Sequence, residues 1–254
     1  MNVVLLTQND PFFLAENLDY LFSKIPSEVR VSGCVVFDAS PFGKKEGFLK
    51  KSAKTFNIFG LKFFIRYALT YIKNMFDRNK NVKSILKKFA IPVISTENSI
   101  NSEKSLNNIK KYQPDLLISI AANRIFKKQL IELAPKGCLN LHTALLPKYR
   151  GLFPSFWALK NNEKQTGVSV FFVDDGIDNG PILLQKTIEI QNMTWAELIK
   201  HTKRIGMQAV LEAIELIHNG SFKLIENDIS KSSYYHFPSK QDVKEFLKAG
   251  KKFF

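Results

Sequence analysis

Cysteine is scarce in this 254-residue chain, which has only two. Cys34 and Cys138 each lie inside an apolar run, without the CxxC or Cys/His spacing of a zinc site. This pattern excludes a disulfide framework and gives no indication of a metal site. We therefore expect two buried free thiols in a reducing, cytoplasmic compartment.

Glycine-rich phosphate loops are also missing. The first apolar run leads into TQNDPFF, which contains neither GxGxxG nor GxxxxGK[ST], so we expect no dinucleotide or P-loop site there. No long charge-free apolar run suggests a spanning helix, because Lys62, Arg66 and Lys73 interrupt residues 56–76. The amino-terminal MNVVLLTQND has no basic segment before a long apolar core, and it predicts a first strand rather than a signal peptide.

Acidic residues are outnumbered by basic ones, 23 to 37, which gives a formal net charge of +14. Such a charge favours an anionic partner, namely a nucleotide, a nucleic acid or an anionic membrane surface. The lysines are scattered, with some density at 44–54, 80–88 and 248–252, and no RNA-binding motif accompanies them. A lysine-rich solvated surface is therefore the alternative explanation.

Short apolar runs alternate with helical patterns along the chain. Helical periodicity covers 13–24, 82–89 and 103–112, and strands alternating with helices predict an α/β fold: a mainly parallel, Rossmann-like sheet with helices on both faces. The short loop DDGIDNGP predicts an antiparallel final strand pair. The predicted strands cover residues 3–7, 31–37, 91–95, 115–120, 137–142, 167–173 and 182–190.

The remaining patterns predict the domain organisation. Thr194 and Glu197 have the spacing of a capping box for a long helix. We expect one domain over residues 1–220, with a helical insert at about 44–89, and a C-terminal appendage over 221–254. The aromatic tail should contain a short docked helix, because three apolar residues recur there at helical spacing: Val243, Phe246 and Leu247.

The insert offers a further pattern over residues 60–76. In a helix, Lys62, Arg66, Thr70 and Lys73 fall on one stripe and leave a broad face of Phe, Ile, Leu and Tyr. We expect this face to pack against the domain or against a second subunit in a homodimer. A peripheral membrane contact is the alternative.

Candidate chemistry lies at the end of the predicted strand GCLNLH. Side chains alternate along a strand, so Asn140 and His142 should share one face while Leu139 and Leu141 face the core. We expect the aspartate-rich loop DDGIDNGP at the same carboxyl edge of the sheet, where ligands of open α/β sheets bind. A carboxylate beside an imidazole orients it and favours its protonated form, and an asparagine amide can donate to an oxyanion. Acyl transfer without a covalent nucleophile is one interpretation, and ordinary turn chemistry is the other.

The succession NLHTALLPKYRG and QTGVSVFFVDDGIDNGPILLQ resembles the formyltetrahydrofolate-dependent formyltransferase family. The family pattern runs N-x-H, a small-residue-Leu-Leu-Pro-x-x-x-Gly turn, T-G-x-[ST] and G-x-D-x-G, and every part appears here in order. The resemblance covers residues 85–220 well, the first strand weakly and residues 40–80 hardly at all. Ser169 stands where many members have threonine, and Thr143-Ala144 replaces a more usual small-Ser pair.

This resemblance implies a catalytic set of Asn140, His142 and Asp178. It implies N10-formyltetrahydrofolate as the co-substrate and no metal. An amine would attack the formyl carbon, His142 and Asn140 would stabilise the oxyanion, and Asp178 would orient His142 and help to move protons. The implied folate pocket uses mainly backbone atoms of two loops: Ala122, Asn123, Arg124, Ile125, Phe126, Val173, Asp174 and Gly176.

The acceptor that we expect is the amino group of a nucleotide-linked amino sugar. Methionyl-tRNA members of the family carry a barrel-like C-terminal domain, whereas about 35 residues follow the long helix here, and glycinamide ribonucleotide members are usually shorter. Lys148, Tyr149 and Arg150 are the predicted phosphate contacts, with a purely loop-tying role as the alternative for Arg150. Methionyl-tRNA or glycinamide ribonucleotide formylation, formyltetrahydrofolate hydrolysis, and a non-catalytic basic RNA- or membrane-binding module remain as alternative functions.

Overall fold

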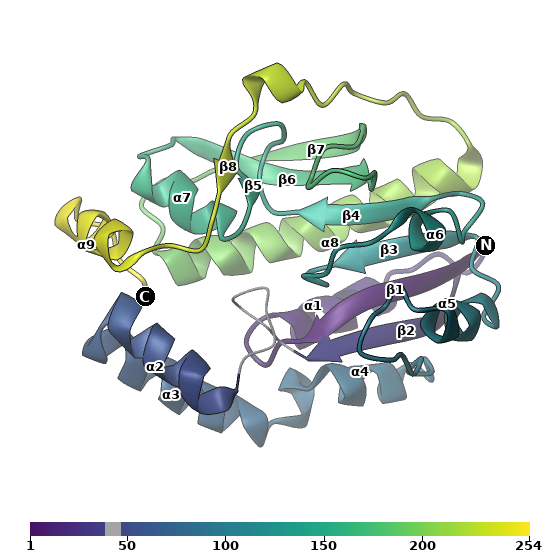
Figure 1. The fold of residues 1–254 in the computed structure, drawn as a ribbon. Helices are drawn as coiled ribbons and strands as arrows, with labels where there is room; N and C mark the ends of the chain where they lie inside the picture. Colours follow the sequence, from purple (N-terminus) through teal and green to yellow (C-terminus); the bar gives the residue numbers. More distant parts are fainter. Residues whose placement is uncertain (39–46) are drawn as a thin grey trace.

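A computed structural model of the protein describes residues 1–38 and 47–254. Its centre is a six-stranded sheet in the order β2-β1-β3-β4-β6-β7 (Figure 1). The first residues of the predicted insert, 44–46, lie outside the described residues. The sheet strands are β1 (Asn2–Asn9), β2 (Arg30–Asp38), β3 (Leu116–Ile120), β4 (Cys138–His142), β6 (Gln165–Phe172) and β7 (Ile182–Glu189), and a separate pair consists of β5 (Arg150–Gly151) and β8 (Tyr234–Tyr235).

Helices connect and flank these strands, and the described part of the predicted insert contains α2, α3 and α4. The helices are α1 (Leu14–Phe22), α2 (Phe48–Phe59), α3 (Leu61–Met75), α4 (Val82–Lys88), α5 (Glu103–Lys110), α6 (Lys128–Ile131), α7 (Pro154–Lys160), α8 (Trp195–Asn219) and α9 (Lys240–Lys248), with single 3-10 turns η1 (Arg78–Lys80) and η2 (Ile229–Lys231).

The sheet confirms the predicted α/β class. Strands β2, β1, β3 and β4 are parallel, and the predicted antiparallel pair is β6 with β7. Strand β6 also runs antiparallel to β4. The strand predicted over residues 91–95 is wrong: this segment makes one isolated bridge, between Val93 and Cys34. Pro92 has no N–H to donate, so a regular ladder cannot continue through it.

Both faces of the sheet are covered, as predicted. One aliphatic core lies between the sheet and α1, α4 and α8, and a second lies between the sheet and α5 and α6. The two cysteines are free and buried in these cores, and burial raises the pKa of the Cys138 thiol to about 12. No helix in the described ranges is long and apolar enough to cross a membrane.

The long helix α8 begins where the sequence predicts. The Thr194 hydroxyl accepts from the Glu197 backbone N–H at 3.3 Å, and the Glu197 carboxylate accepts from the Thr194 N–H at 2.8 Å. This is the predicted capping box. Gly220 ends the helix in a left-handed conformation, with φ of 68°.

A further core is aromatic and joins the insert and the tail to the start of α8. We call it the aromatic cluster and define it by six buried side chains: Phe59, Phe63, Phe156, Trp195, Phe246 and Phe253. The predicted tail helix is α9, which buries Val243 and Phe246, whereas Leu247 is 49% exposed, contrary to prediction. Lys160 of α7 forms ion pairs with two residues of α9: its Nζ lies 3.2 Å from Oδ1 of Asp242 and 2.8 Å from Oε2 of Glu245.

Candidate active site

Strand β4 presents alternate side chains to different surroundings, as predicted. Leu139 and Leu141 belong to the aliphatic core under α8. Asn140 and His142 line a cleft of about 1610 Å³ at the carboxyl ends of the parallel strands. His142 is only 7% exposed, so its ring nitrogens depend on protein partners.

Both ring nitrogens of His142 face oxygen atoms. Its Nε2 lies 2.7 Å from the Tyr149 carbonyl oxygen, and because a carbonyl only accepts, Nε2 carries a hydrogen and donates. Its Nδ1 lies 3.7 Å from Oδ2 of Asp178. The carbonyl therefore fixes the ring orientation, with Nδ1 facing the Asp178 carboxylate.

The loop that carries Asp178 starts at one end of β4 and reaches His142 at the other. Because β6 is antiparallel to β4, Phe172 pairs with Leu139 near the amino end of β4, and the following loop starts at that end. Because Asp178 lies 3.7 Å from His142, the loop must return along the sheet, and its residues 173–178 line the cleft. The loop therefore reaches the carboxyl edge, as expected, although the direction of β6, which sets where the loop starts, was not predicted.

Backbone contacts hold Asp178 in place. Its backbone has a positive φ of 53°, and its Oδ2 accepts from the Gly151 N–H at 2.9 Å. Gly151 itself has φ of 91°, and a Cβ there would lie 2.3 Å from the Tyr235 carbonyl oxygen. Only glycine fits this close approach of β5 to β8.

Asn227, which no sequence pattern marks, supports the same loop. Its Nδ2 donates to the carbonyl oxygens of Asp178 and Gly180, at 2.9 and 3.0 Å. It lies in the irregular segment after α8, where no periodicity marks it, and its effect depends on a contact across 49 positions. The predicted appendage therefore contributes to the support of the site.

Ser169 holds the loop that follows His142. Its hydroxyl donates to the Ala144 carbonyl at 2.7 Å and accepts from the Leu146 N–H at 3.0 Å. The Gln185 side-chain amide also donates to it, at 2.8 Å. The serine found where many family members have threonine keeps the hydroxyl that these bonds need.

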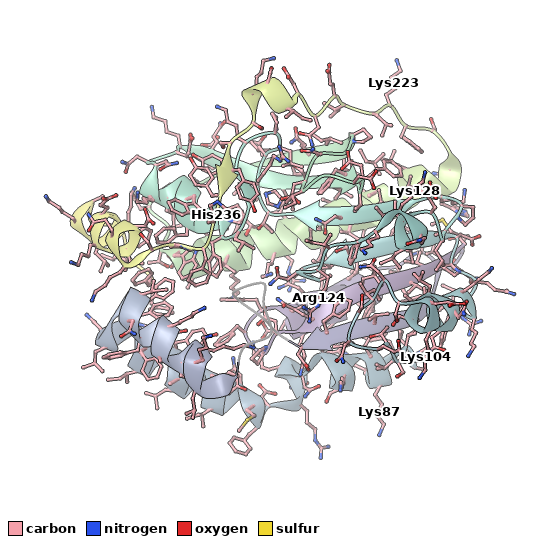
Figure 2. All side chains as sticks on the ribbon, viewed as in Figure 1. Lys87, Lys104, Arg124, Lys128, Lys223 and His236 are labelled. Atoms are coloured by element: carbon pink, nitrogen blue, oxygen red, sulfur yellow. The ribbon has the colours of Figure 1, made fainter. Side chains whose placement is uncertain are left out.

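All eight predicted folate contacts line the cleft. They come from the loops after β3 and β6, and Ala122 and Phe126 are buried while Asn123 has a positive φ of 49°. Figure 2 shows Arg124 near the centre of the molecule, and its guanidinium lies 5.3 Å from the Phe37 ring centroid. Lys87 and Lys223, by contrast, point away from opposite ends of the molecule.

The three predicted phosphate contacts lie outside the lining of the cleft. Lys148 is exposed, and Tyr149 is buried with its hydroxyl donating to Glu163 at 2.6 Å. Burial and this bond raise the pKa of the Tyr149 hydroxyl. Arg150 donates from Nε and Nη2 to the Ile177 carbonyl, with the Nε distance at 2.8 Å. This geometry favours the loop-tying alternative for Arg150.

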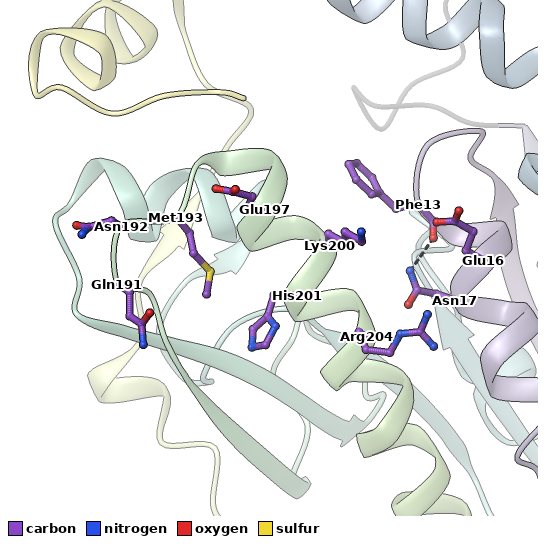
Figure 3. Close-up of a pocket in the computed structure, with 10 residues that line it drawn as sticks. All are labelled: Phe13, Glu16, Asn17, Gln191, Asn192, Met193, Glu197, Lys200, His201 and Arg204. Atoms are coloured by element: carbon purple, nitrogen blue, oxygen red, sulfur yellow. Dashed lines mark hydrogen bonds between the residues drawn. The ribbon is translucent and has the colours of Figure 1, made fainter.

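A second hollow, of about 600 Å³, lies between α1 and α8 (Figure 3). Glu16, Glu197, Lys200 and Arg204 give it mixed charge, and Asn17 donates to the Phe13 carbonyl at 2.7 Å. Glu197 already serves the capping box. The polar residues of this hollow are therefore explained by helix capping and by solvated charges. The catalytic candidates line the larger cleft instead.

The sequence of this chain is similar to a protein-family profile and to curated proteins of the same family. A family profile described as Formyl transferase matches residues 71–214. Methionyl-tRNA formyltransferase of Kosmotoga olearia is 38% identical over 163 residues, which is 64% of this chain and 52% of the relative. The same enzyme of Thermotoga maritima is 33% identical with the same coverage. The chain spans about half the length of the curated relatives it matches.

Solved structures share the fold along most of the chain. A sugar N-formyltransferase from a Shewanella species has a TM-score of 0.60 at 19% identity, covering 98% of this chain and 87% of the other. An N-formyltransferase from Helicobacter canadensis, solved with folinic acid and dTDP-3-aminofucose, has a TM-score of 0.56 at 20% identity, covering 94% and 71%.

Proposed function

Because the chain belongs to the formyl transferase family, we propose that it transfers a formyl group from N10-formyltetrahydrofolate to a primary amine. The observation that carries this proposal is the buried His142–Asp178 pair beside Asn140, at the wall of a large cleft. These residue types can stabilise an oxyanion and move a proton without a covalent intermediate.

The cleft suits a flat folate ring. Ala122, Phe126 and Val173 supply apolar walls, and the backbone of their loops supplies donors and acceptors for an amide-like ring edge. When bound, N10-formyltetrahydrofolate would supply a formyl carbon attached to a nitrogen that can leave. The loops of residues 121–126 and 173–178 would hold it.

The residues of this chain then have distinct roles in the proposal. The Asn140 amide and the protonated Nδ1 of His142 donate to the oxygen that acquires negative charge during transfer. Asp178 orients the ring and stabilises its positive charge. Binding both reactants in one cleft supplies proximity, worth effective molarities of about 10⁵ M or more.

For the acceptor we propose the amino group of a nucleotide-linked amino sugar. A cleft of about 1610 Å³ has room for two ligands of the usual pocket size, roughly 300–1,000 Å³ each. Phe12 and Tyr67 stack with centroids 4.5 Å apart in its wall and offer an aromatic surface to a base. Arg66 and Lys203 also line the cleft and suit a diphosphate.

Methionyl-tRNA is the second candidate acceptor, and the names of the curated relatives favour it. Those relatives extend well beyond the region matched here, so their tRNA substrate is itself a proposal for this chain. The buried free thiols accord with the cytoplasmic location that we propose for either reaction.

The test is a turnover assay with N10-formyltetrahydrofolate and one amine at a time: nucleotide-linked amino sugars, methionyl-tRNA, glycinamide ribonucleotide, or none. Mass spectrometry would detect the gain of one formyl group, with His142→Ala as the inactive control. Sugar formylation supports the main proposal, and formylation of tRNA alone supports the second. Amine-independent formate release would identify a hydrolase, and no turnover with any amine would overturn the enzymatic proposal.

A further inference from the structure

Helix α3 has two apolar sides with different surroundings. One side faces the molecule, where Phe63 and Asn74 are buried and Tyr67 lines the cleft. The other side carries four exposed residues that do not line the cleft, and we call them the outer stripe: Leu61 (60% exposed), Ile65 (49%), Leu69 (64%) and Phe76 (79%). At about 100° per residue, these four span only about 80° around the axis and form one strip, and Ile72, 51% exposed, lies in the same arc where the strip borders the cleft.

Basic residues border the outer stripe. Lys62 and Lys73 follow it directly around the helix, at about 100° and 120° from Leu61. The thirty residues from Gly47 to Phe76 contain six Lys and Arg and no Asp or Glu. An exposed apolar strip beside unbroken positive charge is the pattern of a helix that lies in a membrane interface.

We propose that the outer stripe docks on an anionic lipid surface, with α3 lying in the plane of the interface. Its apolar side chains would enter the boundary between headgroups and acyl chains, and the bordering cations would contact lipid phosphates. A spanning arrangement is excluded because α3 has 15 residues and is cationic. Figure 1 shows α2 and α3 at the lower edge of the molecule, away from β7 and β8.

Charge favours lipid over a second copy of the chain. In an antiparallel pair of α3 helices packed stripe to stripe, Lys62 of one copy would lie beside Lys73 of the other, and neither 47–76 segment supplies a carboxylate to neutralise them. Like charges in close contact across an interface are unfavourable. An anionic bilayer provides the opposite charge over its whole surface. The membrane alternative therefore explains the apolar strip and its cationic border together.

The experiment measures co-sedimentation of the full chain with vesicles. We expect binding to vesicles of phosphatidylglycerol and phosphatidylcholine, weak binding to pure phosphatidylcholine, and a decrease as salt rises. Ile65→Glu with Leu69→Glu should reduce binding at least tenfold. The matched control is Leu224→Glu with Ile229→Glu, because these side chains have similar exposure, 48% and 55%, on the segment after α8. Lys62→Gln with Lys73→Gln should weaken binding only to the anionic vesicles.

Thermal unfolding of each variant would show that it folds, because both glutamate pairs replace exposed side chains. Equal binding by wild type and the Ile65/Leu69 variant would overturn the proposal. The proposal would also be overturned if sedimentation velocity showed a dimeric wild type and a monomeric Ile65/Leu69 variant. The outer stripe would then be a subunit interface. Vesicle binding is independent of formyl transfer, so failure here would leave the proposed function standing.

Discussion

The sheet core and the aromatic cluster support different parts of one cleft. The core on the sheet consists of aliphatic side chains, and their positions follow from the alternation of side chains along each strand. The sheet fixes the position of His142 at the end of β4. The aromatic cluster gathers residues from the insert, from α7, from the start of α8 and from the tail. It supports α3, which forms the opposite wall of the cleft. The comparison shows that the chemistry and the shape of this site depend on separate cores.

Substitutions at the end of β4 test this separation most strongly. His142→Ala and Asp178→Asn should each lower kcat by about 10²- to 10⁴-fold, because oxyanion stabilisation and proton transfer are lost. Neither side chain belongs to a hydrophobic core, so the loss of stability should stay within about 1–3 kcal/mol, the cost of the His142 bond to the Tyr149 carbonyl. His201→Ala, in the second hollow, is the matched control. If either variant kept more than about a tenth of wild-type kcat, the role given to that residue would be wrong.

Substitution in the aromatic cluster should instead lower the free energy of unfolding. Phe246 is fully buried and stacks on Phe156 at 4.8 Å and on Phe253 at 5.0 Å, so Phe246→Ala should lower the free energy of unfolding by about 3–5 kcal/mol. Its neighbour Leu247 is 49% exposed, and Leu247→Ala should cost less than about 1 kcal/mol. Urea unfolding measures both. Equal losses would mean that the tail helix does not dock through Phe246.

Local patterns in the sequence account for most of the sheet and for the nearest part of the site. Alternation in β4 separates Leu139 and Leu141 from Asn140 and His142, and the capping box fixes the start of α8, because both depend on neighbouring residues. The reversal of the loop before Asp178 depends on the direction of β6, a property of the whole sheet. The role of Asn227 depends on a distant contact with no sequence pattern.

Asn227 lies where the tail segment meets the catalytic loop. Asn227→Asp keeps the size of the side chain and removes both N–H bonds, to Asp178 and to Gly180. Losing buried bonds of this kind costs about 1–3 kcal/mol, and displacement of Asp178 should lower kcat by roughly tenfold at nearly unchanged KM. Asn192→Asp, at an exposed position, is the control. A destabilised variant with unchanged kcat would show that Asn227 supports only the fold.

Arg150 should give the smallest effect, and it separates two interpretations of the same side chain. Its guanidinium donates to the Ile177 carbonyl, one residue before Asp178, and it does not line the cleft. If Arg150 only holds this loop, Arg150→Ala removes partly exposed hydrogen bonds that contribute about 0.5–1.5 kcal/mol. The KM values for N10-formyltetrahydrofolate and for the acceptor should then rise together, by about 2- to 10-fold. A phosphate contact would instead raise the acceptor KM alone. Lys148→Ala, on the exposed neighbour, should change neither value. Steady-state kinetics with both substrates varied would distinguish these two roles. A rise in the acceptor KM alone would support the phosphate-binding role that the sequence predicted for Arg150.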